Sequence, residues 1–149
     1  MNKVFLDTNI LLDVFFPDRR FTVASSEILS MAGQEQFRYC ISSLSIADIA
    51  YVLGKNRGKE YAFGVLRDVF SNHRVLPVND MCVYHALRSE CPDFEDAMQI
   101  ACADYGGCDC IVTANARKFR GYAPMPVFTP EEFLAGIRTA NEAAIRTTE

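Results

Sequence analysis

The 149-residue chain lacks the features of several common protein classes. No stretch approaches the roughly 18 apolar residues that a transmembrane helix needs. The opening residues lack the small-residue cleavage site of a secretory leader, so we expect a cytoplasmic protein. Basic residues are not in excess: 15 Lys and Arg against 19 Asp and Glu give a net charge of −4. This balance argues against coating of nucleic acid by bulk charge, but allows an enzyme with a local basic rim and a metal.

Motifs for soft-metal and nucleotide sites are also missing. The six cysteines include no C-x-x-C pair, so we expect small core thiols in a reducing compartment rather than a zinc ribbon. The two histidines, His73 and His85, lack the spacing of metal ligands. No G-x-x-x-x-G-K, G-x-G-x-x-G or G-x-S-x-G sequence occurs, which removes nucleotide cradles and the nucleophile elbow of hydrolases.

Half of the residues are hydrophobic, and the length suits one domain, 1–149, with an exposed C-terminal tail over 138–149. Strand-like and helix-like segments alternate. This order predicts an α/β fold: a three-layer α/β/α sandwich with a mainly parallel central sheet of four to five strands. The expected strands are 3–6, 38–41, 74–78, 108–113 and 127–128. The expected helices are 9–16, 23–32 capped by Thr22, 43–53 closed by Gly54, 59–72, 79–90, 93 to the glycine pair 106–107, and one opened by the 129–132 capping box.

Asp7 is the first candidate site residue. It directly follows the apolar strand Val4-Phe5-Leu6, where an unpaired carboxylate is costly unless it is protonated, hydrogen-bonded or bound to a metal. A helix N-cap at Asp7 or Thr8 is the alternative interpretation. In parallel sheets the ligand crevice lies beyond the carboxyl ends of the strands, and Asp7 is placed there.

Asp48 has mostly apolar helical neighbours at three and four positions, which predicts that it points inward. A capping box formed by Ser45 and Asp48 is an equally good interpretation. On the next acidic helix, we expect Asp93 to be the N-cap and Asp96 to face the packed side as a ligand. Glu95 is assigned to the favourable charge of a first helical turn.

After the fourth strand, Thr113 and Asn115 offer a hydroxyl and an amide that could orient water or phosphate. A turn residue is the alternative for Asn115. Arg117 and Lys118 follow directly and are the best candidates for contacts with an RNA backbone. Asn9, Ser42 and Asp93 are expected to support the site or orient water.

Carboxylate and amide oxygens are hard donors that suit Mg²⁺ or Mn²⁺ rather than zinc. Such ions activate water and stabilise an in-line displacement at phosphorus. An aspartyl phosphatase of the haloacid dehalogenase type, with Asp7 as nucleophile, is a weaker possibility. That chemistry expects a second Asp two residues later, where this chain has Asn9.

Together, Phe5-Leu6-Asp7-Thr8-Asn9, Asp48 after Ile41-Ser42-Ser43, Asp93-Phe94-Glu95-Asp96-Ala97 and Ile111-Val112-Thr113-Ala114-Asn115 resemble a PIN domain. More narrowly, the chain is similar to VapC-type toxin ribonucleases of bacterial toxin–antitoxin systems. The resemblance implies Mg²⁺- or Mn²⁺-dependent cleavage of single-stranded RNA, a homodimer and a cognate antitoxin protein. It assigns metal binding to Asp7, Asp48 and Asp96.

The chain departs from the family pattern at two positions. Asp48 stands where glutamate is common, and Asn115 where aspartate is often found. The site would therefore carry less negative charge and hold one metal more firmly than two. A second hypothesis follows: a PIN-like RNA- or protein-binding module whose catalytic site has degenerated.

Overall fold

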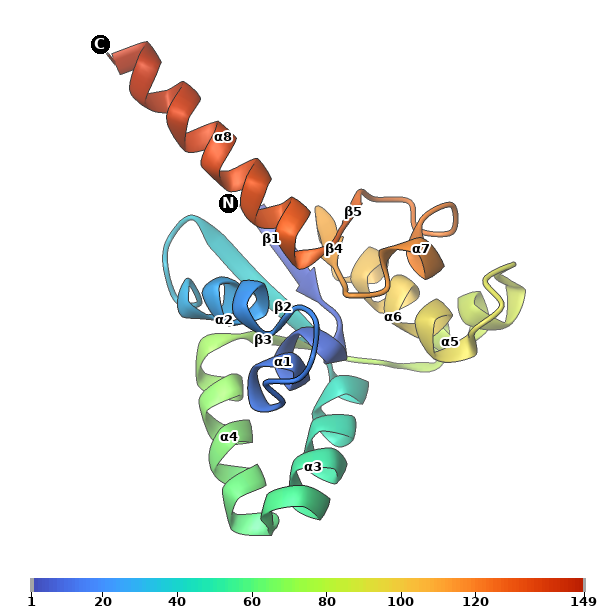
Figure 1. Cartoon of the computed structure of the whole chain (residues 1–149). Coiled ribbons are helices and arrows are strands. Elements are labelled where there is room, and N and C mark those ends of the chain that lie inside the picture. Colours follow the sequence, from blue (N-terminus) through green and yellow to red (C-terminus); the bar gives the residue numbers. More distant parts are fainter. Residues whose placement is uncertain (1, 149) are drawn as a thin grey trace.

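The structure is a computed structural model that describes residues 2–148, and its centre is a five-stranded parallel sheet (Figure 1). The strands are β1 (Asn2–Leu6), β2 (Phe37–Ser42), β3 (Arg74–Leu76), β4 (Cys110–Val112) and β5 (Val127–Phe128). Their order in the sheet is β3-β2-β1-β4-β5, and each neighbouring pair is parallel. The predicted fold class is confirmed.

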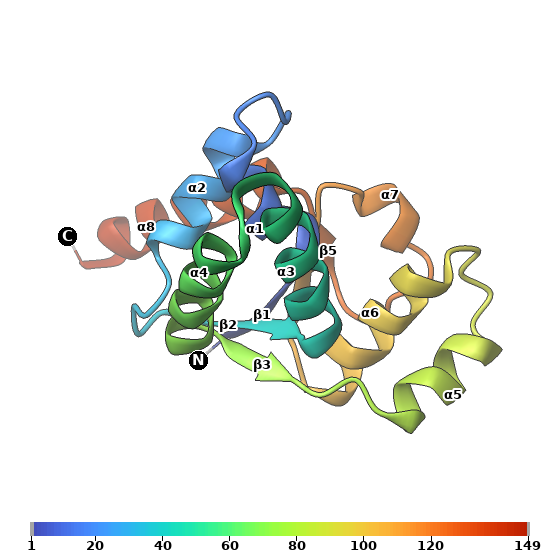
Figure 2. The same ribbon diagram turned by 90° about the horizontal axis from the view of Figure 1, so that it is seen from below.

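Eight helices occur within residues 2–148 and cover both faces of this sheet (Figure 2). They are α1 (Thr8–Phe15), α2 (Thr22–Ser30), α3 (Ser43–Arg57), α4 (Lys59–Asn72), α5 (Asp80–Arg88), α6 (Phe94–Tyr105), α7 (Ala116–Phe119) and α8 (Pro130–Thr148). Among these residues, none of the helices combines the length and apolarity required to span a bilayer.

The alternation of side chains along β1 explains the three layers. Val4 and Leu6 pack into one core with α1 to α4 and the start of α8, whereas Phe5 packs into the other with α5, α6 and α7. Successive residues of a strand point to opposite faces, so an uninterrupted apolar strand supplies both cores. The six cysteines are free and buried, and all but Cys110 lie in the Phe5 core.

Several helix ends agree with the local sequence signals. Asn79 and Asp93 cap α5 and α6 with their side chains. The capping box before α8 is present, because Thr129 Oγ1 accepts from the Glu132 amide and Glu132 accepts from the Thr129 amide. The expected exposed tail is the outer part of α8, which projects from the body of the molecule (Figure 1).

Two local expectations were wrong, and one short helix was missed. Gly54 does not close α3, which continues to Gly58, where a φ of 89° suits glycine. Thr22 does not cap α2; its hydroxyl lies 2.9 Å from the carbonyl oxygens of Asp13, Phe16 and Arg19 and can donate to one of them at a time. The short helix α7 was not expected, because four residues carry too little periodicity to predict one.

Candidate active site

Asp7 lies at the carboxyl end of the central strand, at the base of a cleft. Its backbone amide continues the sheet by donating to the Val112 carbonyl at 3.0 Å, so the strand geometry sets the position of its side chain. The carboxylate is only 6% exposed. Its Oδ1 accepts from the Thr8 amide at 2.9 Å, which makes Asp7 the N-cap of α1. Asp7 is therefore both the N-cap of α1 and a lining residue of the cleft.

Three further donors hold this carboxylate. Gln99 Nε2 reaches Oδ1 at 3.1 Å, while Asn9 Nδ2 and Thr113 Oγ1 reach Oδ2 at 3.1 and 2.7 Å. Burial raises the pKa of Asp7, and the hydrogen bonds from Gln99 and Thr113 oppose that rise. The donors fix the orientation of the carboxylate and leave its outer side toward the cleft.

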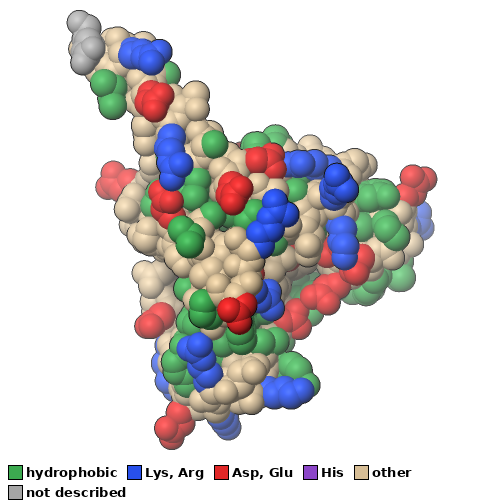
Figure 3. All heavy atoms as spheres, viewed as in Figure 1, with side chains coloured by type: hydrophobic (Ala, Val, Ile, Leu, Met, Phe, Trp, Pro, Cys, Tyr) green, Lys and Arg blue, Asp and Glu red, His purple; other side chains and the backbone are tan. Residues whose placement is uncertain are grey.

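The cleft has a volume of about 380 Å³ and is strongly acidic. Carboxylates from three parts of the chain line it, together with a single cation, Lys118. The acids are Asp7, Asp48, Asp93, Glu95 and Asp96. In the space-filling view, acidic side chains gather in the hollow between α3 and α6, with basic side chains beside them over α7 (Figure 3).

The pKa values of two of these acids, Glu95 and Asp96, are raised, in part by the neighbouring carboxylates. The pKa of Glu95 is raised to about 7, first because its carboxyl group hydrogen-bonds that of Asp48, and then by burial and the charge of Asp48. The pKa of Asp96 is raised to about 6 by burial and by the charges of Asp93 and Asp7, against the opposing charge of Lys118. Acids that hold protons near neutral pH lack a compensating cation.

A buried amide stands behind the acids and links the elements that carry them. Gln99 donates to Ser45 Oγ at 3.0 Å as well as to Asp7, and accepts from the Ser42 hydroxyl. Ser42 caps α3 by accepting from the Ser45 amide at 3.1 Å. The Ser45–Asp48 capping box therefore does not form, since Ser45 serves this network and Asp48 is free to line the cleft.

The predicted residues divide into those that border the cleft and those that lie behind it or outside it. Asp7, Asn9, Asp48, Asp93, Asp96, Asn115 and Lys118 border it. Thr113 and Ser42 are fully buried behind it. Thr113 donates to Asp7 and accepts from the Asn115 amide at 3.1 Å, so it positions both. Arg117 is exposed on α7 and is not among the lining residues.

Glu95 and Gln99 were missed from the sequence. Glu95 was attributed to the helix dipole, and only the approach of α3 to α6 places it against Asp48. Gln99 had a usable signal, because it is the one polar side chain in the apolar stretch from Ala97 to Ala103. Buried amides need hydrogen-bonding partners, so such a residue predicts a polar network.

The donor set fits a divalent cation. Carboxylate and amide oxygens are the donors that Mg²⁺ and Mn²⁺ prefer. Within residues 2–148, no three Asp, Glu, His or Cys side chains are grouped to hold one ion directly. Magnesium commonly binds through one or two carboxylates and keeps several waters, so an ion in this cleft would be held partly through water.

Comparisons with known proteins agree with the fold. A family model described as PIN domain matches residues 3–117. Ribonuclease VapC1 of Aquifex aeolicus is 29% identical over 137 residues, which cover 88% of this chain and 92% of that protein.

Among solved structures, VapBC2 from Rickettsia felis, bound to a DNA fragment from its promoter, has a TM-score of 0.65 at 17% identity over 85% of this chain and 98% of that one. A toxin–antitoxin complex from Klebsiella pneumoniae has a TM-score of 0.64 at 22% identity, over 85% and 97% of the two chains. Because the family match spans most of the sequence, the chain belongs to the PIN domain family.

Proposed function

We propose that the protein is a divalent-metal-dependent endoribonuclease that cleaves single-stranded RNA. The observation that carries this proposal is the convergence of five carboxylates on one cleft, two of which have strongly raised pKa values. The resemblance to Ribonuclease VapC1 of Aquifex aeolicus supports the same reaction class.

Asp7, Asp48 and Asp96 would hold Mg²⁺ or Mn²⁺, and Glu95 is added as a fourth acid because it shares a hydrogen bond with Asp48. When bound, the ion would neutralise these carboxylates, lower the pKa of a coordinated water and polarise the phosphodiester. The protein's part is to keep the Asp7 carboxylate in one orientation through the donors from Gln99, Thr113, Asn9 and Thr8. A fixed carboxylate avoids reorganisation during the reaction.

Asn115 and Lys118 supply the phosphate side of the cleft. Both line it, and the Thr113 hydroxyl accepts a hydrogen bond from the backbone amide of Asn115. Lys118 would contact a non-bridging phosphate oxygen, and the Asn115 side chain would orient water or phosphate. Arg117 would contact the RNA backbone farther out, because it is exposed on the same short helix.

The test is cleavage of single-stranded RNA with Mn²⁺ by the wild type, Asp7→Asn and Asp96→Asn. Each substitution is expected to lower the rate at least about 100-fold, in line with the loss of a group that fixes transition-state charge. Glu90→Gln is a matched control, since Glu90 is exposed and does not line the cleft. Undiminished cleavage by both aspartate variants would reject the assignment.

A non-catalytic PIN-like binding module is the second candidate. The departures from the family pattern at Asp48 and Asn115 motivate it. Within residues 2–148, no three acidic, histidine or cysteine side chains are placed to bind one ion directly. A melting temperature that does not change with millimolar Mn²⁺, together with RNA binding and no cleavage, would support this module over the enzyme.

The cellular role that we propose is the toxin of a toxin–antitoxin pair, acting as a homodimer. Proteins of similar fold include toxin–antitoxin complexes, which motivates a cognate antitoxin partner. Expression of the chain alone and with the product of an adjacent small open reading frame tests this role. Growth arrest that the second gene does not relieve would contradict it.

A further inference from the structure

Four side chains on the outer surface of α5 and α6 form an exposed series, here called the aromatic ladder: Arg88, Tyr84, His85 and Tyr105. The Arg88 guanidinium lies 4.4 Å from the centre of the Tyr84 ring. The Tyr84 and His85 rings are 5.3 Å apart, and so are the His85 and Tyr105 rings. Tyr84 is 45% exposed and Tyr105 is 53% exposed, so the ladder is not part of either core.

The Tyr84 and His85 rings meet edge to face, and the His85 and Tyr105 rings are tilted against each other. The interplanar angle is 83° between Tyr84 and His85 and 58° between His85 and Tyr105. Arg88 covers one face of Tyr84, and His85 contacts both tyrosine rings, so another planar group can stack only on the exposed parts of Tyr84 and Tyr105. Exposed aromatic faces beside arginine are the surface on which single-stranded nucleic acids stack their bases.

Positive charge gathers where the ladder ends. Gly106 directly follows Tyr105, and its carbonyl accepts from Lys3 Nζ at 3.3 Å. Arg38 is opposite Lys3 on the next strand, and Arg74 is opposite Cys40 on the strand beyond. A hydrogen bond with Cys108 is the main cause that lowers the pKa of the Cys40 thiol, and the charges of Lys3, Arg74 and Arg38 lower it further, in keeping with their placement around Cys40.

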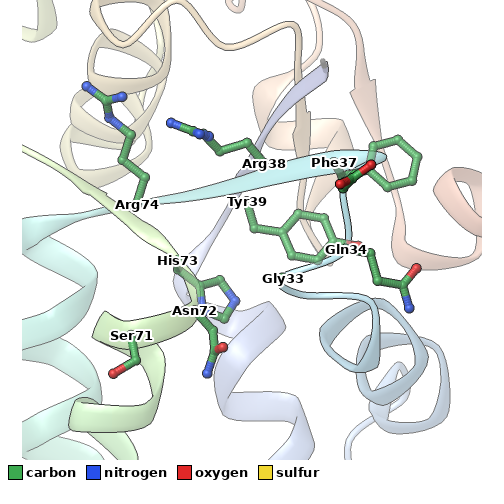
Figure 4. A pocket seen from close by; sticks show the side chains of 10 residues that line it. Gly33, Gln34, Phe37, Arg38, Tyr39, Ser71, Asn72, His73 and Arg74 are labelled. Carbon is green, nitrogen blue, oxygen red and sulfur yellow. The ribbon is translucent and has the colours of Figure 1, made fainter.

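Two of these cations form no ion pair with another residue of the described range. Asp109 accepts from the Lys3 backbone amide at 2.8 Å and so offsets the Lys3 charge. Within residues 2–148, no salt bridge involves Arg38 or Arg74. Figure 4 shows both arginines pointing to the same side of β2, away from Tyr39 and His73. Unpaired like charges at one edge repel, and an anion would relieve that repulsion.

We propose that the aromatic ladder, with Arg38 and Arg74 at its end, binds single-stranded RNA outside the acidic cleft. Bases stack on Tyr84 and Tyr105, and phosphates contact the two arginines. This surface rests on the proposed ribonuclease function, because it would hold the part of the substrate that flanks the cleaved bond. The 12-residue helix α6 joins the two sites, with Asp96 near one end and Tyr105 at the other. Asp96 and Tyr105 are nine residues apart in this helix, so at a rise of about 1.5 Å per residue they are separated by about 14 Å along its axis.

RNA binding without cleavage is the direct test. Fluorescence anisotropy with a labelled single-stranded RNA of about 12 nucleotides in EDTA measures affinity for the full chain. Tyr84→Ala and Tyr105→Ala are each expected to weaken binding about tenfold, the usual effect of losing one stacked base. The Phe variants keep the ring and are expected to bind as the wild type does. Leu87→Ala is the matched control, because Leu87 is 72% exposed on the same helix but has no ring.

The arginines are tested through salt dependence. Each phosphate contact on a single strand contributes about 0.7 to the slope of log K against log salt, so Arg38→Ala and Arg74→Ala should each reduce that slope by about 0.7. A loss of folding stability alone would not change the slope. The proposal would be overturned if both tyrosine variants bound RNA with unchanged affinity, or if Leu87→Ala weakened RNA binding as much as they do. Either result would indicate that this face binds a protein instead.

The outcome is independent of the test of catalysis. If Asp7→Asn still cleaves RNA while the ladder variants bind it weakly, the assignment of the cleft fails and the ladder stands. If Asp7→Asn is inactive and the ladder variants bind as the wild type does, the ladder fails and the ribonuclease stands.

Discussion

Replacing Glu95 by glutamine is expected to stabilise the metal-free protein, although it removes a carboxylate proposed to hold the metal. Glu95 and Asp48 place two carboxyl groups in contact, and the pKa of Glu95 rises from 4.5 to about 7. At pH 8 Glu95 is ionised, and the folded state bears its repulsion from the charge of Asp48. Glutamine has the shape of the protonated acid without the charge, so it removes this cost.

The size of the effect follows from linkage. A rise of about 2.5 pH units at about 1.36 kcal/mol per unit corresponds to at most about 3.4 kcal/mol above pH 7. Glu95 is exposed to solvent, which screens the repulsion, so we expect about 1 kcal/mol. The sign is fixed by proton binding. Between pH 4.5 and 7 the folded state binds more protons than the unfolded state, and stability therefore falls as the pH rises through this window.

The measurement is thermal unfolding in EDTA. Glu95→Gln should raise the melting temperature by about 3 °C at pH 8 and by close to zero at pH 5, where the folded wild type is already protonated. With saturating Mn²⁺ the wild type should have the higher melting temperature of the two, because the Glu95 carboxylate would bind the ion and the glutamine of the variant carries no charge. Glu90→Gln is the control for the loss of an exposed acid outside the cleft.

A double-mutant cycle with Asp48→Asn tests the contact itself. Either substitution removes the same repulsion. The gain in stability of the double variant should therefore be smaller than the sum of the gains of the two single variants. Equal gains at pH 5 and pH 8, or full additivity, would refute the shared-proton explanation.

Three other predictions concern the surroundings of the site. Gln99→Ala should lower the free energy of unfolding, measured in urea, by about 2–4 kcal/mol, because the buried Asp7 carboxylate and Ser42 hydroxyl each lose a hydrogen-bonding partner. A loss below about 1 kcal/mol would contradict this role of the Gln99 side chain. Mn²⁺ at about 100 times its dissociation constant should raise the melting temperature by about 5–10 °C, and Asp7→Asn should abolish most of that rise. Burial lowers the pKa of His73 below 6.5, so the contribution of the neutral imidazole to stability is present above pH 6.5 and is lost as the pH falls. Between pH 7.5 and pH 5.5 the wild type should therefore lose more stability than His73→Asn. An equal loss in the two proteins would contradict the prediction.

Local sequence signals were sufficient where a single segment carried the information. The apolar strand that ends at Asp7 supplies both cores by simple alternation, and the polar residues after β1 and β4 had to meet at one edge once the sheet was parallel. Caps at Asn79, Asp93 and Thr129 depend on neighbours within four residues. The order of elements and the position of the cleft followed from these signals.

Contacts between elements were decided only by the tertiary structure. Glu95 joins the cleft because α6 brings it against Asp48 of α3, and no local pattern separates that arrangement from an ordinary first-turn acid. Gln99 ties Asp7 to Ser42 and Ser45 across three elements. The sequence by itself determined the sheet and the acids at its edge, since alternation and turn chemistry act over a few residues. Which side chains share a proton or a hydrogen bond depends on how the helices pack on both faces of that sheet.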